Sequence, residues 1–300
     1  MKKNTVIYIS IIASALVVGI AGGVVAKQIL GKENVVYVGD SDSLYANGPE
    51  IKAKYESYKG SSQTKDFQTW ELVVVSLEKY RNLEYSYSYS KGMAKTIVNQ
   101  EIRNFQIRNG NNYFEESLSK SSMVSVAKRM YQTNVGGNVK VHEGTIANSN
   151  PESASFKEGY KEYNPQEYKN YLGRTLDTMF IYAISDKTVI NQKTTVLDNG
   201  DIELYVDLSP TKSTVAYQVQ MKNISNLDQR PVFDYVHLTY VVTSDMMLKT
   251  LHVDERFSAK SMGFEPTIYN DIDTYYYPNQ KYEIPTYDTK VNYSLKGEQE

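Results

Sequence analysis

Residues 83–90 read Leu-Glu-Tyr-Ser-Tyr-Ser-Tyr-Ser, with an apolar or aromatic side chain at every second position. Side chains of a β-strand point alternately to its two faces, so this stretch predicts a strand with one apolar and one polar face. Such a strand is typical of an antiparallel sheet that packs one side on a core. The composition agrees, because the chain contains 27 tyrosines against 8 phenylalanines and 1 tryptophan, and tyrosine suits a half-buried pleated surface.

Three dipeptides predict β-hairpins, at Asn109-Gly110, Gly136-Gly137 and Asn199-Gly200. They supply the positive φ angles that short hairpin turns need. The strands predicted around and beyond them are residues 105–108, 113–118, 130–135, 139–142, 189–197, 202–208, 215–221, 236–242, 248–257 and 268–277. About ten or eleven strands in one open sheet have to curve. The sequence therefore predicts a curved antiparallel half-barrel, mainly β with some α-helix.

Helices are expected to cover the apolar face of this sheet, because a one-sided apolar sheet needs a second layer. Apolar side chains recur at intervals of three and four over residues 67–80, with Asp66 as the predicted N-cap. A short helix is also expected at residues 51–58.

A second amphipathic helix is predicted over residues 164–184. Asn164 and Glu167 form a capping box, and Pro165 occupies the first helical position. The apolar stripe of this helix includes Tyr168, Leu172 and Met179. We expect this stripe to pack into the concave face of the sheet.

Residues 4–26 form an uncharged run of 23 residues. A helix of this length spans a hydrocarbon core of about 30 Å, so the run predicts a transmembrane helix. Lys2 and Lys3 lie in the stub of residues 1–3, which favours a cytoplasmic N-terminus and a body outside the cytoplasm. The apolar side chains of the run include Val6, Ile11 and Leu16.

Two features of this segment leave alternatives open. The small residues Val24-Val25-Ala26 would also suit a cleaved signal peptide, although a typical apolar core of such a peptide is only about 7–15 residues long. Gly19 and Gly23 form a GxxxG pattern, which can bring two membrane helices together as a dimer. The alternative is that glycine is simply common in membrane helices.

The remaining boundaries follow from composition. Residues 27–65 carry turn-forming residues and are assigned to a juxtamembrane linker, residues 66–285 to one β domain, and residues 286–300 to a polar tail. The expected location is the cell membrane, with a single span and the β domain outside the cytoplasm.

The sequence contains no pattern that builds an enzyme. Without cysteine there can be no disulfide, no thiol chemistry and no lipoprotein anchor. Lys and Arg number 33 against 35 Asp and Glu, which argues against nucleic-acid binding. His142, His237 and His252 lack metal-ligand spacing, and the last two should point away from the apolar face. Asp271 and Asp273 share a solvated strand face. We expect no catalysis, no cofactor and no metal ion.

Tyrosines and their neighbours are the candidate ligand-binding residues. They can be interpreted as the lining of a pocket for an acyl chain or aromatic ligand, or as a packed sheet face with hydroxyl groups at its rim. The candidates are Tyr85, Tyr87, Tyr89, Tyr168, Leu172, Met179, Tyr217 and Tyr240.

The order of predicted elements is a helix at 67–80, strands over 83–142, a helix at 164–184 and strands over 188–277. This order resembles the LolA/LolB-like lipoprotein-carrier superfamily, which includes the N-terminal domain of RseB-type sensors. The resemblance implies a half-barrel over residues 66–285 with helices on its concave face. Several members bind lipid tails there, and others are protein regulators at the cell envelope.

The carriers of that superfamily are soluble or lipid-anchored, whereas this chain is expected to be tied to a membrane by a helix. We therefore expect local binding rather than transport, by a membrane-anchored protein of Gram-positive type. The expected ligand is a lipid or another apolar molecule in the half-barrel. The alternative is a module that docks an envelope enzyme or complex through the convex face or a strand edge.

Overall fold

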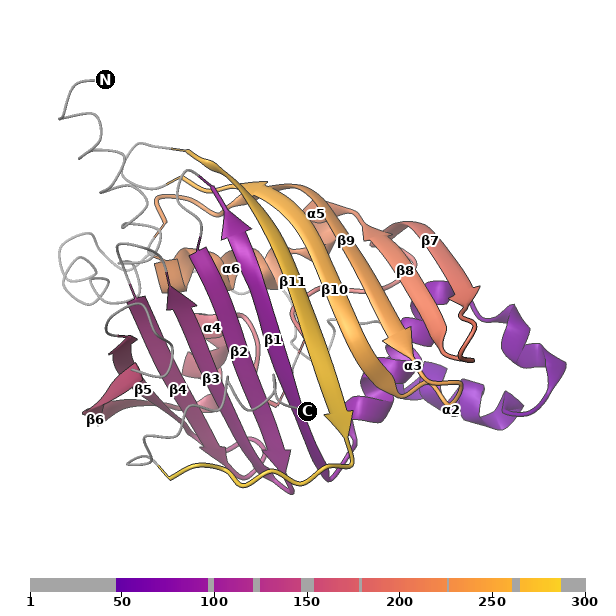
Figure 1. Cartoon of the computed structure of the whole chain (residues 1–300), viewed down its shortest axis with the longest axis horizontal. Helices are drawn as coiled ribbons and strands as arrows, with labels where there is room; N and C mark the ends of the chain where they lie inside the picture. The colour runs from indigo at the N-terminus through magenta and orange to yellow at the C-terminus, as the bar shows by residue number, and fades with distance from the viewer. Residues whose placement is uncertain are drawn as a thin grey trace.

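The computed structural model describes residues 47–96, 100–120, 125–146, 154–177, 180–225, 227–260 and 265–286. They form one open antiparallel sheet of eleven strands with helices on one side (Figure 1). The predicted membrane segment, residues 4–26, lies outside the described residues, as do Val6, Ile11, Leu16, Gly19 and Gly23. Within the described part of the chain, no helix combines the length and the hydropathy that a membrane span requires.

The helices are α2 (Gly48–Tyr58), the 3-10 helix η2 (Ser62–Asp66), α3 (Thr69–Arg81), α4 (Pro165–Leu172), α5 (Pro210–Ser213) and α6 (Val215–Ser225). The first six strands are β1 (Tyr85–Lys95), β2 (Gln100–Asn109), β3 (Asn112–Lys120), β4 (Ser125–Thr133), β5 (Val139–Ile146) and β6 (Ala154–Tyr163). The other five are β7 (Val189–Val196), β8 (Ile202–Leu208), β9 (Val232–Val242), β10 (Leu248–Ser258) and β11 (Thr267–Pro278).

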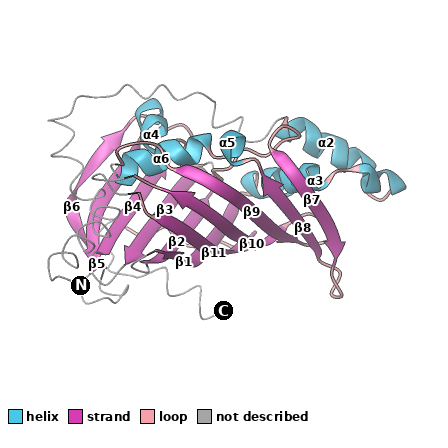
Figure 2. Cartoon of the chain, turned by 90° about the horizontal axis from the view of Figure 1, so that it is seen from above, coloured by secondary structure: helices cyan, strands magenta, loops and turns pink. Residues whose placement is uncertain are grey.

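The sheet consists of two meanders joined in its middle. Its order is β6-β5-β4-β3-β2-β1-β11-β10-β9-β8-β7, so the first strand pairs with the last. In this central pair Ser88 lies opposite Tyr276, and Tyr87 lies opposite Tyr277. Figure 2 shows the curved sheet from above, with the helices along one side. The predicted class, mainly β with a large open antiparallel sheet, is confirmed.

All three predicted hairpin turns are present. They connect β2 to β3, β4 to β5 and β7 to β8. Gly110, Gly136 and Gly200 have φ values of 61°, 73° and 83°, in the left-handed region that favours glycine. Local turn chemistry was therefore sufficient to place these three connections.

The helix α3 was predicted within two residues at its start, but its predicted cap is wrong. Asp66 ends η2, and Gln68 caps α3 instead, through a capping box with Glu71. The short helix expected at residues 51–58 is present as α2, which begins three residues earlier, and η2 follows it in the segment that the sequence assigned to the linker. They pack on the domain through Tyr55, whose ring lies 5.4 Å from that of Phe67.

Residues 215–221 were predicted as a strand and form most of α6 instead. Alternation over so few residues cannot distinguish a strand from a helix segment. Ser209 followed by Pro210 is a helix-start signal, and it begins α5 directly before α6.

The second predicted helix is much shorter than expected. Its capping box is correct, because Asn164 Oδ1 accepts from the Glu167 N–H at 2.9 Å. However, α4 ends at Leu172, since Gly173 adopts a φ of 73° and forms a left-handed cap. A Cβ at Gly173 would lie 2.4 Å from the carbonyl oxygen of Ala216, so α6 also requires a glycine there. The strand β6 was missed, because its sequence is polar and it lies at an edge of the sheet.

Candidate binding site

The sheet has a helix face, which carries α3 to α6, and an outer face on the opposite side. On the helix face, the side chains of β8 to β11 form the main apolar core together with the helices that cover them. The helix α3 lies against β7, β8 and β10, and Val73, Val74 and Leu77 are fully buried. The sheet residues that meet this core include Leu204, Val206, Leu208, Val236, Leu238 and Tyr240. This half of the helix face is therefore closed by the chain itself.

One carboxyl group lies inside this core. Glu255 is fully buried and accepts hydrogen bonds from the hydroxyl groups of Tyr182 at 2.6 Å and Tyr217 at 3.2 Å. The amide of Asn270 donates to the same side chain at 2.7 Å. Burial raises the pKa of Glu255, and the three hydrogen bonds, each of which lowers it, only partly oppose this effect. The group ties α6 and the segment before β7 to the sheet.

The helix face of β1 to β5 has a different chemistry, because polar side chains line it. Ser86 and Ser88 are buried on this face, beside the hydroxyl group of Tyr80 on α3. Farther along, Glu115 forms a buried ion pair with Arg174, with 2.7 Å between Oε2 and Nη2. Gln106 also donates to Glu115, at 3.0 Å. This pair holds the segment after α4 against β3.

A small apolar cluster lies beneath α4, separate from the main core. We call it the α4 cluster, and it consists of Tyr113, Met130, Val139, Val141, Tyr168, Leu172 and Leu176. The hydroxyl of Tyr168 donates to Met130 Sδ at 3.1 Å. The helix α4 has eight residues, and it covers this part of the helix face together with the segment after it, which supplies Leu176, while α6 packs against α4.

Lys128 lies beside the α4 cluster. Its side chain is on the same face of β4 as Met130, and the residue is 6% exposed. The ammonium donates to the hydroxyl of Tyr171 at 2.6 Å and lies 5.3 Å from the centre of that ring. Tyr171 in turn stacks on Tyr163, with ring centres 5.2 Å apart. Burial lowers the pKa of Lys128 to about 8 and raises the pKa of Tyr171 to about 12.

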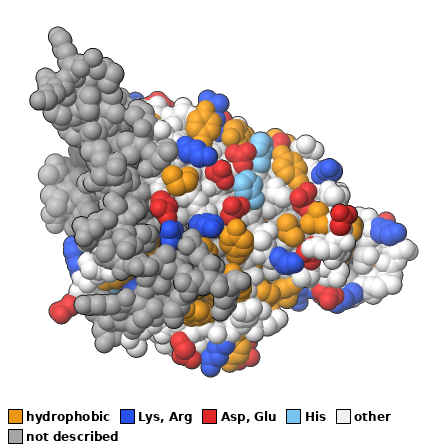
Figure 3. Space-filling view, in the orientation of Figure 1, with side chains coloured by type: hydrophobic (Ala, Val, Ile, Leu, Met, Phe, Trp, Pro, Cys, Tyr) orange, Lys and Arg blue, Asp and Glu red, His pale blue; other side chains and the backbone are white. Residues whose placement is uncertain are grey.

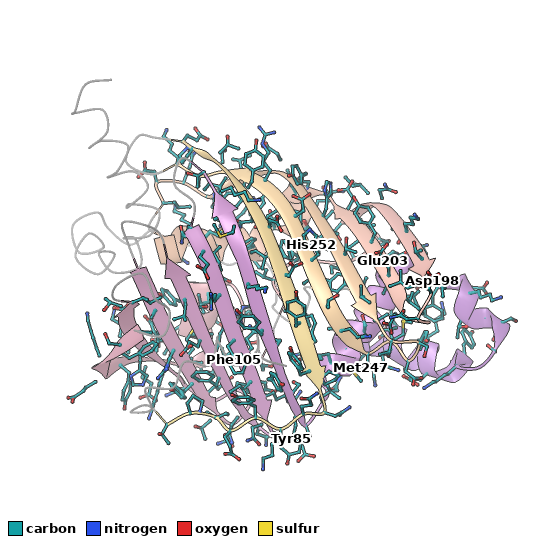
Figure 4. All side chains as sticks on the ribbon, in the orientation of Figure 1. Tyr85, Phe105, Asp198, Glu203, Met247 and His252 are labelled. Atoms are coloured by element: carbon teal, nitrogen blue, oxygen red, sulfur yellow. The ribbon has the colours of Figure 1, made fainter. Side chains whose placement is uncertain are left out.

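The outer face of β1 to β3 carries a separate aromatic cluster. Tyr87 and Tyr89 pack there with Phe105, Ile107 and Phe114. The segment after β11 crosses this cluster, and the ring of Tyr282 lies 5.2 Å from those of Tyr87 and Phe105. Figure 4 labels Phe105 on β2 and Tyr85 at the start of β1.

The predicted ligand-binding residues therefore fall in different places. Tyr168 and Leu172 meet in the α4 cluster, whereas Tyr217 and Tyr240 belong to the main core. The expectation that Tyr85, Tyr87 and Tyr89 share the helix-covered face is wrong, because the serines between them occupy that face instead. Met179 lies outside the described residues.

Sequence reasoning missed Lys128, Glu115 and Arg174. A signal was present for Lys128, since it stands two residues before Met130 and so shares its strand face. For Arg174 the sequence offers no local signal, because its partner Glu115 is 59 residues away.

The remaining polar candidates lie where the alternation placed them, on the outer face. Figure 3 shows histidines there beside acidic side chains. Nδ1 of His252 lies 2.9 Å from Oδ1 of Asp273, and His237 lies between Asp207 and Asp254 at 3.5 Å from each. His142 differs, because it is buried. No group of three or more potential metal ligands occurs among the residues that the structure describes.

Comparison with known proteins adds no family. No protein-family model matches the chain, and no curated protein sequence matches it. The argument about function therefore rests on the residues and their geometry.

Proposed function

We propose that the chain is a membrane-anchored, non-catalytic binding protein whose β domain lies outside the cytoplasm. Its ligand is a lipid or another apolar molecule that binds between α4 and strands β3 to β5. One observation carries the proposal: the α4 cluster is separate from the main core and is covered by an eight-residue helix. In the structure these side chains are packed, so binding requires α4 to move.

The helix face of β8 to β11 is less suited to ligand binding. There α3 is buried along most of its length between α2 and strands β7, β8 and β10. Displacing it would expose many fully buried side chains, at about 1.5–3 kcal/mol for each Val or Leu. An open sheet with helices on one face also agrees with the resemblance to the LolA/LolB-like superfamily, which supports a lipid-like ligand.

Native mass spectrometry of the full chain, purified from its own membrane in a nonionic detergent, tests this proposal. We expect a bound small molecule that Leu172→Trp displaces, because the larger ring fills the α4 cluster. The matched control is Ile190→Trp on β7, at a side chain that is 65% exposed. A chain that carries no small molecule, or carries one that both variants retain, would contradict the proposal.

The proposed orientation has its own test. Protease added to intact cells should remove a C-terminal epitope, because the domain lies outside the cytoplasm. Digestion only after lysis would place the domain inside.

Docking of an envelope protein is the second candidate function. It is favoured by β7, which ends the sheet and has only β8 as a neighbour among the described strands. Ile190 and Val196 on this strand are 65% and 71% exposed, and such an edge can pair with a strand of another protein. A photo-cross-linker at Val196 should then capture one defined protein in cells, whereas a cross-linker at the exposed Lys140 on β5 should not.

A further inference from the structure

We propose that the ligand of the α4 site carries an anionic group, a carboxylate or a phosphate, which the ammonium of Lys128 binds. This inference rests on the proposed function, because it names the chemistry of the ligand at the same site. The ligand class is then an anionic amphiphile rather than a neutral apolar molecule.

Other buried cations of the domain show what Lys128 lacks. Arg174 pairs with Glu115, and Arg129 pairs with Glu116, each at 2.7 Å from a carboxylate that is itself buried. In both pairs the cation and the anion are buried side by side, so their attraction offsets the cost of removing each charge from water. These two pairs occur on opposite faces of the same half of the sheet.

Lys128 has no such partner among the described residues. Its hydrogen bond goes to the neutral hydroxyl of Tyr171. Glu143 lies opposite Lys128 on β5, and its charge raises the pKa of Lys128, but by less than burial lowers it; within the described residues no ion pair within 4.0 Å joins the two side chains. Taking an ammonium out of water without a paired anion costs several kcal/mol. The lowered pKa of Lys128 reflects this cost.

The surroundings of Lys128 suit a molecule with a charged head and an apolar tail. Tyr171 contacts the lysine, Tyr163 stacks on Tyr171, and both tyrosines pack against the α4 cluster. An anion in place of the Tyr171 hydroxyl would give the ammonium a charge-assisted hydrogen bond, which is about twice as strong as a neutral one. The tail would then replace Tyr168 and Leu172 over Met130, directly beside the head group.

Three eight-carbon probes test the inference: octanoate, octyl phosphate and octanol. The full chain is held in phosphatidylcholine nanodiscs, and hydrogen exchange of Pro165–Leu172 is followed at equal free concentrations of each probe. We expect half of the maximal effect at an about tenfold lower concentration for the two anions than for octanol, since a charge-assisted hydrogen bond contributes about 1.5–3 kcal/mol. Octanoate and octyl phosphate together distinguish a carboxylate from a phosphate as the preferred head group.

Lys128 variants assign the preference to this residue. Lys128→Met should abolish the difference between the anions and octanol, and Lys128→Arg should retain it. The matched control is Lys193→Met, at an exposed lysine of β7, which should change nothing. Lys128→Met is expected to fold, because it removes a buried charge.

The outcomes separate the two proposals. If octanol acts as strongly as octanoate, or if Lys128→Met leaves the anion preference intact, the inference is overturned while apolar binding at α4 stands. If none of the three probes changes the exchange of α4, both proposals fail.

Discussion

The two halves of the sheet differ in the side chains that they present to the helices. Strands β8 to β11 present Leu, Val and Tyr side chains to α3, and the result is a core of hydrocarbon. Strands β1 to β5 present serines, amides and charged groups, and the result is a set of paired polar contacts around α4. We infer that the first half provides stability and that the second half, where polar groups fix orientation, provides binding.

The buried ion pair of the second half should give the largest effect. Arg174→Met leaves the carboxylate of Glu115 buried without its cation, which is expected to lower the free energy of unfolding by about 3–5 kcal/mol. Chemical denaturation measures this change. The double variant Arg174→Met/Glu115→Leu should recover most of the loss, and a double variant as unstable as the single one would show that the charges themselves are not the cause.

Matched leucine truncations sharpen the comparison of the two helices. Leu77→Ala in α3 removes a fully buried side chain from the main core and should cost about 2–5 kcal/mol. Leu172→Ala in α4 removes the same atoms from the smaller cluster, which can collapse more easily, so its cost should be clearly lower. Equal losses in melting experiments would mean that α4 is as firmly packed as α3.

A pH series examines Glu255, the fully buried carboxyl group on β10 in the apolar half. The folded-state pKa of Glu255 is raised by burial, so its contribution to stability is present at acidic pH and is lost as pH rises through the folded-state pKa. Glu255→Gln should flatten this dependence, because glutamine keeps the size and does not titrate. Unfolding free energies of both proteins between about pH 4 and pH 8 provide the measurement; parallel curves would contradict the assignment.

The smallest effect is expected at the cap of α4. Asn164→Ala removes the hydrogen bond to the N–H of Glu167 and should cost about 1 kcal/mol. Asn164→Asp serves as the control, since aspartate also accepts this bond and should retain most of the stability. If the alanine variant is unchanged in a denaturant titration, α4 contributes little to the folded state.

What could be predicted from the sequence was mostly local. The turns at Gly110, Gly136 and Gly200 and the capping box at Asn164 each depend on a few adjacent residues, and all are present. The alternation over residues 83–90 correctly predicted a strand with two different faces. It could not tell which face meets the helices, because that depends on the rest of the sheet.

The errors have the same origin. Residues 215–221 form a helix, α6, which packs against α4, and the preceding helix α5 lies on β9. A seven-residue pattern contains no information about these tertiary contacts. The candidate site depends on contacts between distant residues. Lys128 and Tyr171 are 43 residues apart, so only the fold brings the buried ammonium to the α4 cluster.

Hydrogen exchange of the ligand-free full chain tests the central claim that the α3 half is a core and the α4 half is a binding site. We predict that the slowest amides of Thr69–Arg81 exchange only by global unfolding. Those of Pro165–Leu172 should exchange through a local opening of much lower free energy, because a binding helix that must move is drawn from the less stable part of a protein. If both helices exchange with the same free energy, and both respond equally to denaturant, the two halves form one cooperative core and the account is wrong.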